Sequence, residues 1–206
     1  MARTMEDMTA DDLQGESQRL DAIGKFHFAV DDIFDGVMPD GTTEMKNPGL
    51  SVRLRVLAPA DHKDKTIGLI FGDGNMSHKD QGKFAKKKQC ALLVATNVVT
   101  PAQLDGSAFS YDEQLARGMQ LFGELEWGDE DDDGKKYPEL AWANLYHVDD
   151  PRAKSYPRDD EALKVIPTSL RHEKGYFDPL LKKNSPSGSS KSQAQAKPTD
   201  ADFEGL

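Results

Sequence analysis

The strongest constraint on the fold is the alternation of apolar and polar residues from Leu50 to Leu57. Successive side chains of a β-strand point to opposite faces, so this alternation predicts a strand that is buried on one face. Its aliphatic side chains would face a core, and its other face would carry Ser51, Arg53 and Arg55. The two guanidiniums have two interpretations: they keep an exposed sheet face hydrated, or they contact phosphate.

Four more strands and one long helix are predicted around this strand. Alternating or continuous apolar runs predict strands over residues 24–30, 66–71, 119–127 and 140–148. Apolar residues at helical spacing predict a helix over residues 78–97, in which Lys88 shares the apolar side. Three strands, a helix and two further strands follow the order of the five-stranded oligonucleotide-binding (OB) barrel. The expected fold is therefore mainly β with one main helix, a five-stranded OB-like barrel with disordered termini.

The composition of the two ends predicts that they lie outside the folded body. Residues 1–23 are rich in Asp and Glu and poor in apolar side chains, which predicts a flexible acidic arm. Residues 24–181 form the expected nucleic-acid-binding domain with a C-terminal extension. Residues 182–206 are mostly small and polar and end in an acidic tip, which predicts a disordered linker and tail.

Charge is distributed unevenly along the chain. The formal net charge is −10, but residues 49–100 hold nine Lys or Arg against four Asp, a net +5, so the rest carries −15. A polyanion responds to the local field rather than to the sum, so a nucleic-acid partner is compatible with this composition. The chain has no apolar run long enough for a membrane span and a single cysteine, Cys90, which predicts a soluble protein in a reducing cytoplasm.

No pattern of residues predicts an enzyme, a metal site or a cofactor site. The single cysteine and five scattered histidines lack the paired spacing of zinc ligands, and the chain has no nucleophile elbow and no phosphate-binding glycine loop. Asp129, Asp131, Asp133 and Gly134 match the first half of a calcium-binding loop, but the position that needs Glu is Leu140. A metal-dependent nuclease that uses these acids is the least favoured interpretation.

Basic and aromatic side chains that an OB-like barrel would expose are the candidate binding residues. Single strands bind such barrels through cations that follow the phosphates and aromatic rings that stack on the bases. The candidate cations are Lys25, Arg53, Arg55, Lys65, Lys83, Lys86 and Lys87, and the candidate stacking rings are Phe122, Trp127, Tyr137, Trp142 and Tyr146. The competing interpretation is a hydrated surface for the helix lysines and core packing for each ring.

Several stretches between residues 24 and 151 carry a family resemblance. They are Gly24-Lys25-Phe26-His27-Phe28, the strand 50–57, the lysine-rich helix and the stretch GMQLFGELEW…GKKYPELAWANLYHVDDP. Together they resemble a phage and prophage family of single-stranded DNA-binding or recombination-accessory barrels. The resemblance implies a non-enzymatic protein that binds single-stranded DNA in replication, recombination or repair, in the host-cell cytoplasm if it is phage-encoded.

The end of the chain carries a second resemblance. Residues 200–206 resemble the acidic tip of bacterial and phage single-stranded DNA-binding proteins, with Leu in place of a terminal Phe. The resemblance implies that replication or recombination proteins are recruited by Asp200, Asp202, Phe203, Glu204 and Leu206. We also expect the free tail to compete with DNA for the basic groove.

Two alternatives to this interpretation stay open. The tail can be ordinary solubilising disorder, because low-complexity acidic segments do not bury enough apolar surface to fold. The barrel can instead be a protein-binding accessory module with no nucleic-acid role. A homo-oligomer is compatible with either function.

Overall fold

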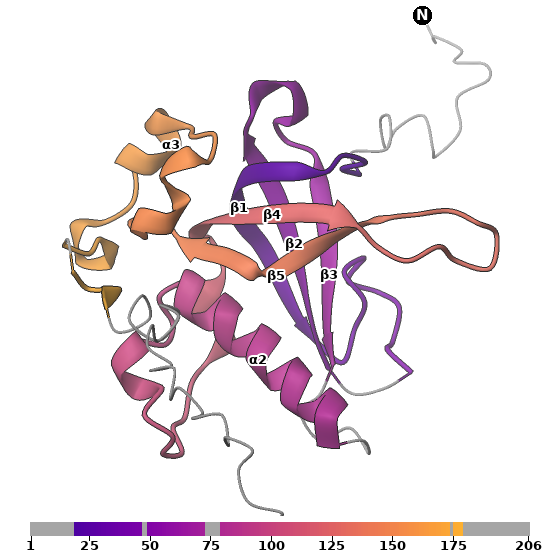
Figure 1. The fold of residues 1–206 in the computed structure, drawn as a ribbon, viewed down its shortest axis with the longest axis horizontal. Helices are drawn as coiled ribbons and strands as arrows, with labels where there is room; N and C mark the ends of the chain where they lie inside the picture. The colour runs from indigo at the N-terminus through magenta and orange to yellow at the C-terminus, as the bar shows by residue number, and fades with distance from the viewer. Residues whose placement is uncertain (1–18, 47–48, 73–78, 174, 179–206) are drawn as a thin grey trace, which may run out of the picture.

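The computed structural model of the chain describes residues 19–46, 49–72, 79–173 and 175–178, with the backbone alone for 79–85. Figure 1 shows one curled β-sheet, a long helix and a C-terminal extension of short helical segments. The strands and helices are β1 (Gly24–Asp35), β2 (Gly49–Ala58), β3 (Thr66–Gly72), α2 (Lys79–Ala95), β4 (Gln120–Trp127), β5 (Pro138–His147) and α3 (Asp160–Lys164). Short 3-10 turns are η1 (Ala60–His62), η2 (Pro101–Gln103), η3 (Glu113–Ala116), η4 (Pro151–Ser155) and η5 (Thr168–Leu170).

The five strands form one antiparallel sheet in the order β3-β2-β1-β4-β5. The central strand β1 pairs with both β2 and β4, and its register to β2 shifts between Val30 and Asp32. An irregularity of this kind bends a strand and increases its twist, so the sheet curls (Figure 1). The expected mainly β architecture, with five strands and a long helix between the third and fourth, is confirmed.

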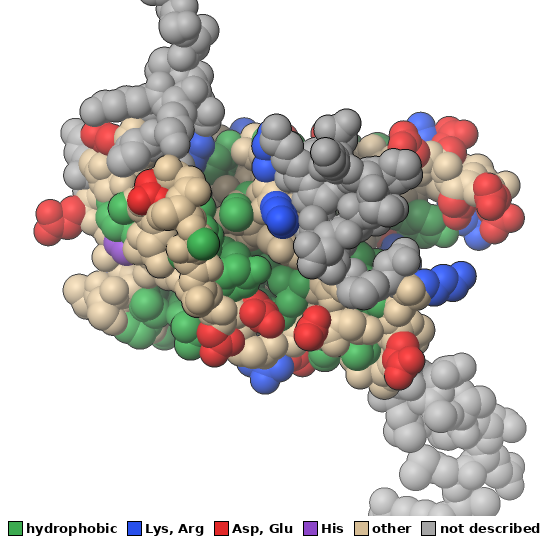
Figure 2. All heavy atoms as spheres, turned by 90° about the horizontal axis from the view of Figure 1, so that it is seen from below, with side chains coloured by type: hydrophobic (Ala, Val, Ile, Leu, Met, Phe, Trp, Pro, Cys, Tyr) green, Lys and Arg blue, Asp and Glu red, His purple; other side chains and the backbone are tan. Residues whose placement is uncertain are grey.

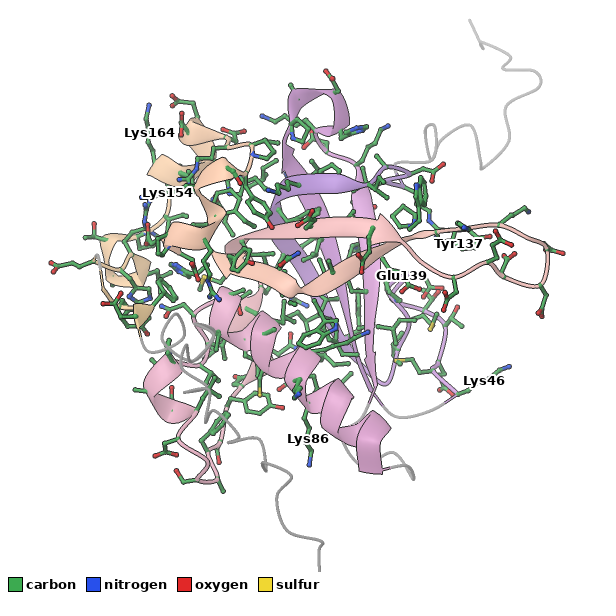
Figure 3. The ribbon with its side chains drawn as sticks, viewed as in Figure 1. Lys46, Lys86, Tyr137, Glu139, Lys154 and Lys164 are labelled. Carbon is green, nitrogen blue, oxygen red and sulfur yellow. The ribbon has the colours of Figure 1, made fainter. Side chains whose placement is uncertain are left out.

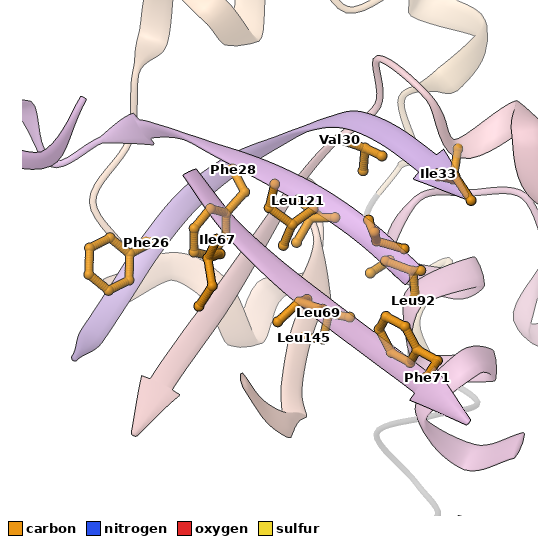
Figure 4. Packing of buried hydrophobic residues seen from close by; sticks show 14 of the residues in the cluster. Phe26, Phe28, Val30, Ile33, Ile67, Leu69, Phe71, Leu92, Leu121 and Leu145 are labelled. Atoms are coloured by element: carbon orange, nitrogen blue, oxygen red, sulfur yellow. The ribbon is translucent and has the colours of Figure 1, made fainter. Parts of the chain in front are cut away.

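The concave face of the sheet holds the main core, which Figure 4 shows from close by. The predicted apolar face of β2 is confirmed, because the aliphatic side chains at positions 50, 52, 54 and 56 are all buried. On the other face Ser51 is buried as well, and its hydroxyl donates to the Val37 carbonyl oxygen. Burying one aliphatic side chain is worth about 2 kcal/mol, so this strand alone contributes strongly to folding. The other strands and α2 complete the core with Phe26, Phe28, Val30, Ile33, Ile67, Leu69, Phe71, Leu92, Leu121, Leu125 and Leu145.

Helix α2 lies across the open side of the curled sheet and contacts β5 and β3. Leu92 and Ala95 insert into the main core, which places the last turns of the helix against the sheet. The predicted helix over residues 78–97 is confirmed with slightly shorter bounds. In the described part of the chain, none of the helices combines the length and the apolar character that a bilayer crossing requires.

The convex face of β1 and β4 is covered by the C-terminal extension, which runs from η4 to Asp178. Phe122 on β4 packs there with Tyr156 and Leu163 in a second, smaller core. Lys63 Nζ lies 3.0 Å from Asp159 Oδ2, and the Asp159 N–H donates to His27 Nδ1 at 3.2 Å. This part of the convex face is therefore an internal interface.

The folded body begins earlier than the sequence predicted. Leu20 is completely buried in the main core, and its N–H donates to the Thr66 carbonyl oxygen at 2.7 Å. Arg19 forms a parallel β-bridge with Thr66. Residues 19–23 therefore belong to the folded body and not to the predicted flexible arm. The boundary predicted at residue 181 lies outside the described residues.

Candidate nucleic-acid groove

Arg53 and Arg55 lie on the convex face of β2, where aspartates compensate their charge. Arg53 Nη2 lies 3.2 Å from Oδ2 of Asp32 on β1. Arg55 Nε lies 3.0 Å from Asp31 Oδ1, and its Nη1 lies 3.3 Å from Asp64 Oδ1. Burial opposes the charge of Arg55, but hydrogen bonds to these two aspartates and their charges outweigh it and raise its pKa. The structure therefore pairs both of these predicted phosphate contacts with aspartates.

The predicted lysines belong to different surfaces. Lys25 donates to Ser155 Oγ at 3.1 Å, so the C-terminal extension holds it. Lys65 is half-buried just before β3, whereas Lys86 and Lys87 are exposed on α2 (Figure 3 labels Lys86). The side chain of Lys83 lies outside the described residues. The predicted lysines whose side chains are described are thus spread over β1, the start of β3 and α2.

Two of the predicted stacking rings pack against the C-terminal extension. Phe122 is completely buried, with its ring centroid 4.7 Å from that of His27 and 5.8 Å from that of Tyr156. Tyr146 is half-buried, edge-on to Tyr156, with the guanidinium carbon of Arg152 4.7 Å from its ring centroid. The prediction that Phe122 stacks on a base is wrong, because the extension fills the space beside its ring. The Tyr146 ring thus already contacts two side chains of the extension, Arg152 and Tyr156.

The remaining rings lie near the opening between the two sheet edges, β3 and β5. Tyr137 is 38% exposed and Trp142 is half-buried, and both line a groove of about 330 Å³. Its walls are residues 68–71 of β3 and the first residues of β5, and Arg19 and Lys88 complete its lining. Trp127 is 45% exposed at the end of β4 but does not line the groove.

The groove combines cations, aromatic rings and one carboxylate. The guanidinium carbon of Arg19 lies 4.8 Å from the ring centroid of Tyr137, within the range of a cation–π contact. The nearby Asp131 carboxylate raises the pKa of the Tyr137 phenol. Arg19 and Lys88 outnumber the single acid in the lining, Glu139.

The loop between β1 and β2 packs on one residue of the groove wall. Pro39 in this loop packs on Gly68 of β3, so closely that a Cβ on Gly68 would lie 2.5 Å from Pro39 Cβ. The β4–β5 hairpin bears Tyr137 at its end. The groove wall therefore contacts the β1–β2 loop at Gly68, and its lining includes Tyr137 of the β4–β5 hairpin.

The tip of the β4–β5 hairpin is acidic and internally organised. Asp131 Oδ1 accepts the N–H groups of Asp133 at 3.0 Å and Lys135 at 2.8 Å, and Lys136 Nζ lies 3.3 Å from Glu130 Oε1. In Figure 2 acidic side chains gather at this projecting end of the molecule. No group of three or more potential metal-ligating His, Cys, Asp or Glu side chains exists among the described residues. The tip would repel a polyanion, so a nucleic acid would follow the β3 and α2 side of the groove.

A second hollow, of about 610 Å³, lies between the end of β5 and the C-terminal extension. Its charged lining consists of Lys154, Arg158, Asp149, Asp150, Glu173 and Asp178, together with His172. Carboxylates outnumber the permanent cations there. The hollow therefore suits a polyanion less well than the groove between β3 and β5.

Sequence reasoning missed Arg19, Lys88 and Glu139 as groove residues. Arg19 was assigned to the acidic arm, and no periodic pattern around Leu20 indicates that this segment joins the sheet. Lys88 did carry a signal, because a lysine on the apolar side of a helix must lie at the edge of the packed face. Glu139 follows a turn in the sequence, and only the pairing of β5 places it in the groove lining.

No family model matches this chain, and no curated protein sequence matches it either. The family resemblance of residues 24–151 and of the tail therefore stays a prediction.

Proposed function

We propose that this protein binds single-stranded DNA and performs no chemistry on it, as an accessory factor in replication, recombination or repair. The curled sheet would be an OB-type barrel whose opening between β3 and β5 serves as the binding site. The order of the strands and the position of α2 between β3 and β4 support this assignment.

The observation that carries the proposal is the groove itself. Two aromatic side chains, Tyr137 and Trp142, line it together with two cations, Arg19 and Lys88. Aromatic rings stack on any base, and cations offset the phosphate charge, so such a lining binds single strands with little sequence preference. The exposed lysines 86 and 87 on α2 would extend the positive path beyond the groove.

The sequence-predicted contacts take different roles in this proposal. Arg53 and Arg55 would stabilise the sheet through their aspartate partners rather than bind phosphate. Lys25, Phe122 and Tyr146 would hold the C-terminal extension. Recruitment of partner proteins by the tail remains part of the proposal, although residues 200–206 lie outside the described residues.

Binding of labelled oligothymidine, followed by fluorescence anisotropy at several salt concentrations, tests the proposal. We expect log K to fall with log salt by about 0.7 for each phosphate that the protein neutralises. Tyr137→Leu should weaken binding about tenfold, because one base–aromatic stack is worth about 1–3 kcal/mol. Tyr111→Leu is the matched control, since Tyr111 is also exposed but does not line the groove.

Three kinds of result would contradict the proposal, in whole or in part. Absence of any oligonucleotide binding, or binding that does not respond to salt, would favour the protein-binding alternative. Equal losses from Tyr137→Leu and Tyr111→Leu would place the site elsewhere on the molecule. Tighter binding of oligouridine than of oligothymidine would keep the groove but make RNA its ligand.

A further inference from the structure

Glu139 is an uncompensated carboxylate in a groove that otherwise suits a polyanion. It is exposed, lines the groove with Tyr137, and has no ion-pair or hydrogen-bond partner among the described residues. Figure 3 shows Tyr137 and Glu139 together at the base of the hairpin. A carboxylate at this position repels phosphate, so a role in general DNA affinity does not explain it.

Sheet stability does not explain Glu139 either. Its direct cross-strand partner is Glu126 on β4, and two like charges directly opposite one another destabilise a sheet. The charge of Glu126 therefore makes the Glu139 carboxylate unfavourable for the stability of the β4–β5 hairpin. A ligand that donates hydrogen bonds would offset this cost.

The Glu139 side chain packs on the backbone of Gly128. A Cβ on Gly128 would lie 2.6 Å from Glu139 Cδ and 2.7 Å from Oε1, so a larger residue at position 128 would displace the carboxylate. Gly128 itself does not line the groove, but it leaves room for the conformation in which Glu139 does.

The chemistry of a carboxylate selects among bases. An ionised carboxylate only accepts hydrogen bonds. Cytosine and adenine offer it an exocyclic amino group, and guanine offers an amino group beside a ring N–H on its Watson–Crick edge. Thymine and uracil offer a single ring N–H between two carbonyl oxygens, which repel a carboxylate.

We propose that Glu139 makes the groove prefer bases that carry an amino group and disfavour thymine and uracil. The base stacked near Tyr137 donates its amino hydrogen to the Glu139 carboxylate. This inference rests on the proposed function, because it assumes that a single strand occupies the groove.

Competition between labelled oligodeoxycytidine and oligothymidine of equal length, at neutral pH and one salt concentration, tests the proposal. These two pyrimidines have similar ring areas, so their stacking differs little. We expect the wild-type protein to bind the cytidine polymer about tenfold more tightly, the size of one modest hydrogen bond to a charged acceptor. Glu139→Gln should remove the preference, because its amide both donates and accepts and therefore suits either base.

The matched control is Glu126→Gln, which removes the same charge directly across the strands. Because Glu126 does not line the groove, this variant should strengthen binding of both polymers equally and keep the preference. Gly128→Ala should reduce the preference by displacing Glu139 while leaving its charge in place.

The outcomes separate this inference from the proposed function. If both polymers bind with equal affinity, or if Glu139→Gln leaves the wild-type preference unchanged, the role of Glu139 is refuted while DNA binding stands. If neither polymer binds, the proposed function itself fails.

Discussion

The interface between β1 and the C-terminal extension contains a titratable group whose effect on stability can be worked out. His27 is completely buried, its Nδ1 accepts the Asp159 N–H, and its Nε2 has no hydrogen-bond partner among the described residues. Burial lowers the pKa of His27 from 6.5 to about 4. This effect outweighs the negative charges of Asp159 and Asp160, which raise the pKa. The Gln120 side chain also favours the charged form of His27 and raises this pKa, whereas the charge of Arg158 lowers it.

The direction of the pH effect follows from proton binding. Between pH 6.5 and about pH 4 the unfolded chain protonates His27 while the folded chain does not, so stability falls as the pH drops through this range. From about pH 7.5 to about pH 5, this single group should cost about 2 kcal/mol of unfolding free energy. His147 is also buried, and burial lowers its pKa to about 4, so the wild-type protein should lose more than this amount.

Urea unfolding at the two pH values, followed by circular dichroism, isolates the contribution of His27. His27→Gln keeps an acceptor for the Asp159 N–H but does not titrate, so its stability should fall about 2 kcal/mol less than that of the wild type. Phe122→Leu is the control, because it weakens the same interface without removing the imidazole and should retain the full pH dependence. If His27→Gln and the wild type lose equal stability, burial does not hold this histidine neutral and the reasoning is refuted.

Two further predictions concern packing. Phe122→Ala should lower the unfolding free energy by about 3–5 kcal/mol in a urea titration, since it empties a fully buried site; a small loss would show that the extension does not pack as described. The same variant, assayed where it is folded, should keep its affinity for oligothymidine, because the ring is not available to a base. Gly68→Ala should cost about 1–3 kcal/mol, because the new methyl group would meet Pro39 at 2.5 Å; unchanged stability would mean that the β1–β2 loop does not rest on β3.

The sequence predicted the strands and the helix because their patterns are local. The alternation from Leu50 to Leu57 depends only on neighbouring residues, and the same side chains are buried on β2. The order of the elements likewise follows directly from the chain. Leu20 was missed because one buried residue carries no periodicity.

Alternation over residues 24–30 puts His27 on the outer face of its strand, but the sequence could not show what covers that face. Local alternation distinguishes the two faces of a strand. It does not show whether water or another segment of the chain covers the outer face. Tyr156 and Asp159, far along the chain, make this part of the face an internal interface. This is why Phe122 is a core residue rather than a stacking platform.

The candidate site itself depended on tertiary structure. Pairing of β1 with β2 places Asp32 opposite Arg53 and so compensates a charge that the sequence leaves unopposed. Curling of the sheet brings residues 68–71 of β3 and the start of β5 to one groove with Arg19. The sequence by itself determined which segments become strands and which face of each carries apolar groups, because both depend on local spacing. Only long-range pairing decided which charges remain available to a ligand, because electrostatic compensation depends on neighbours in space.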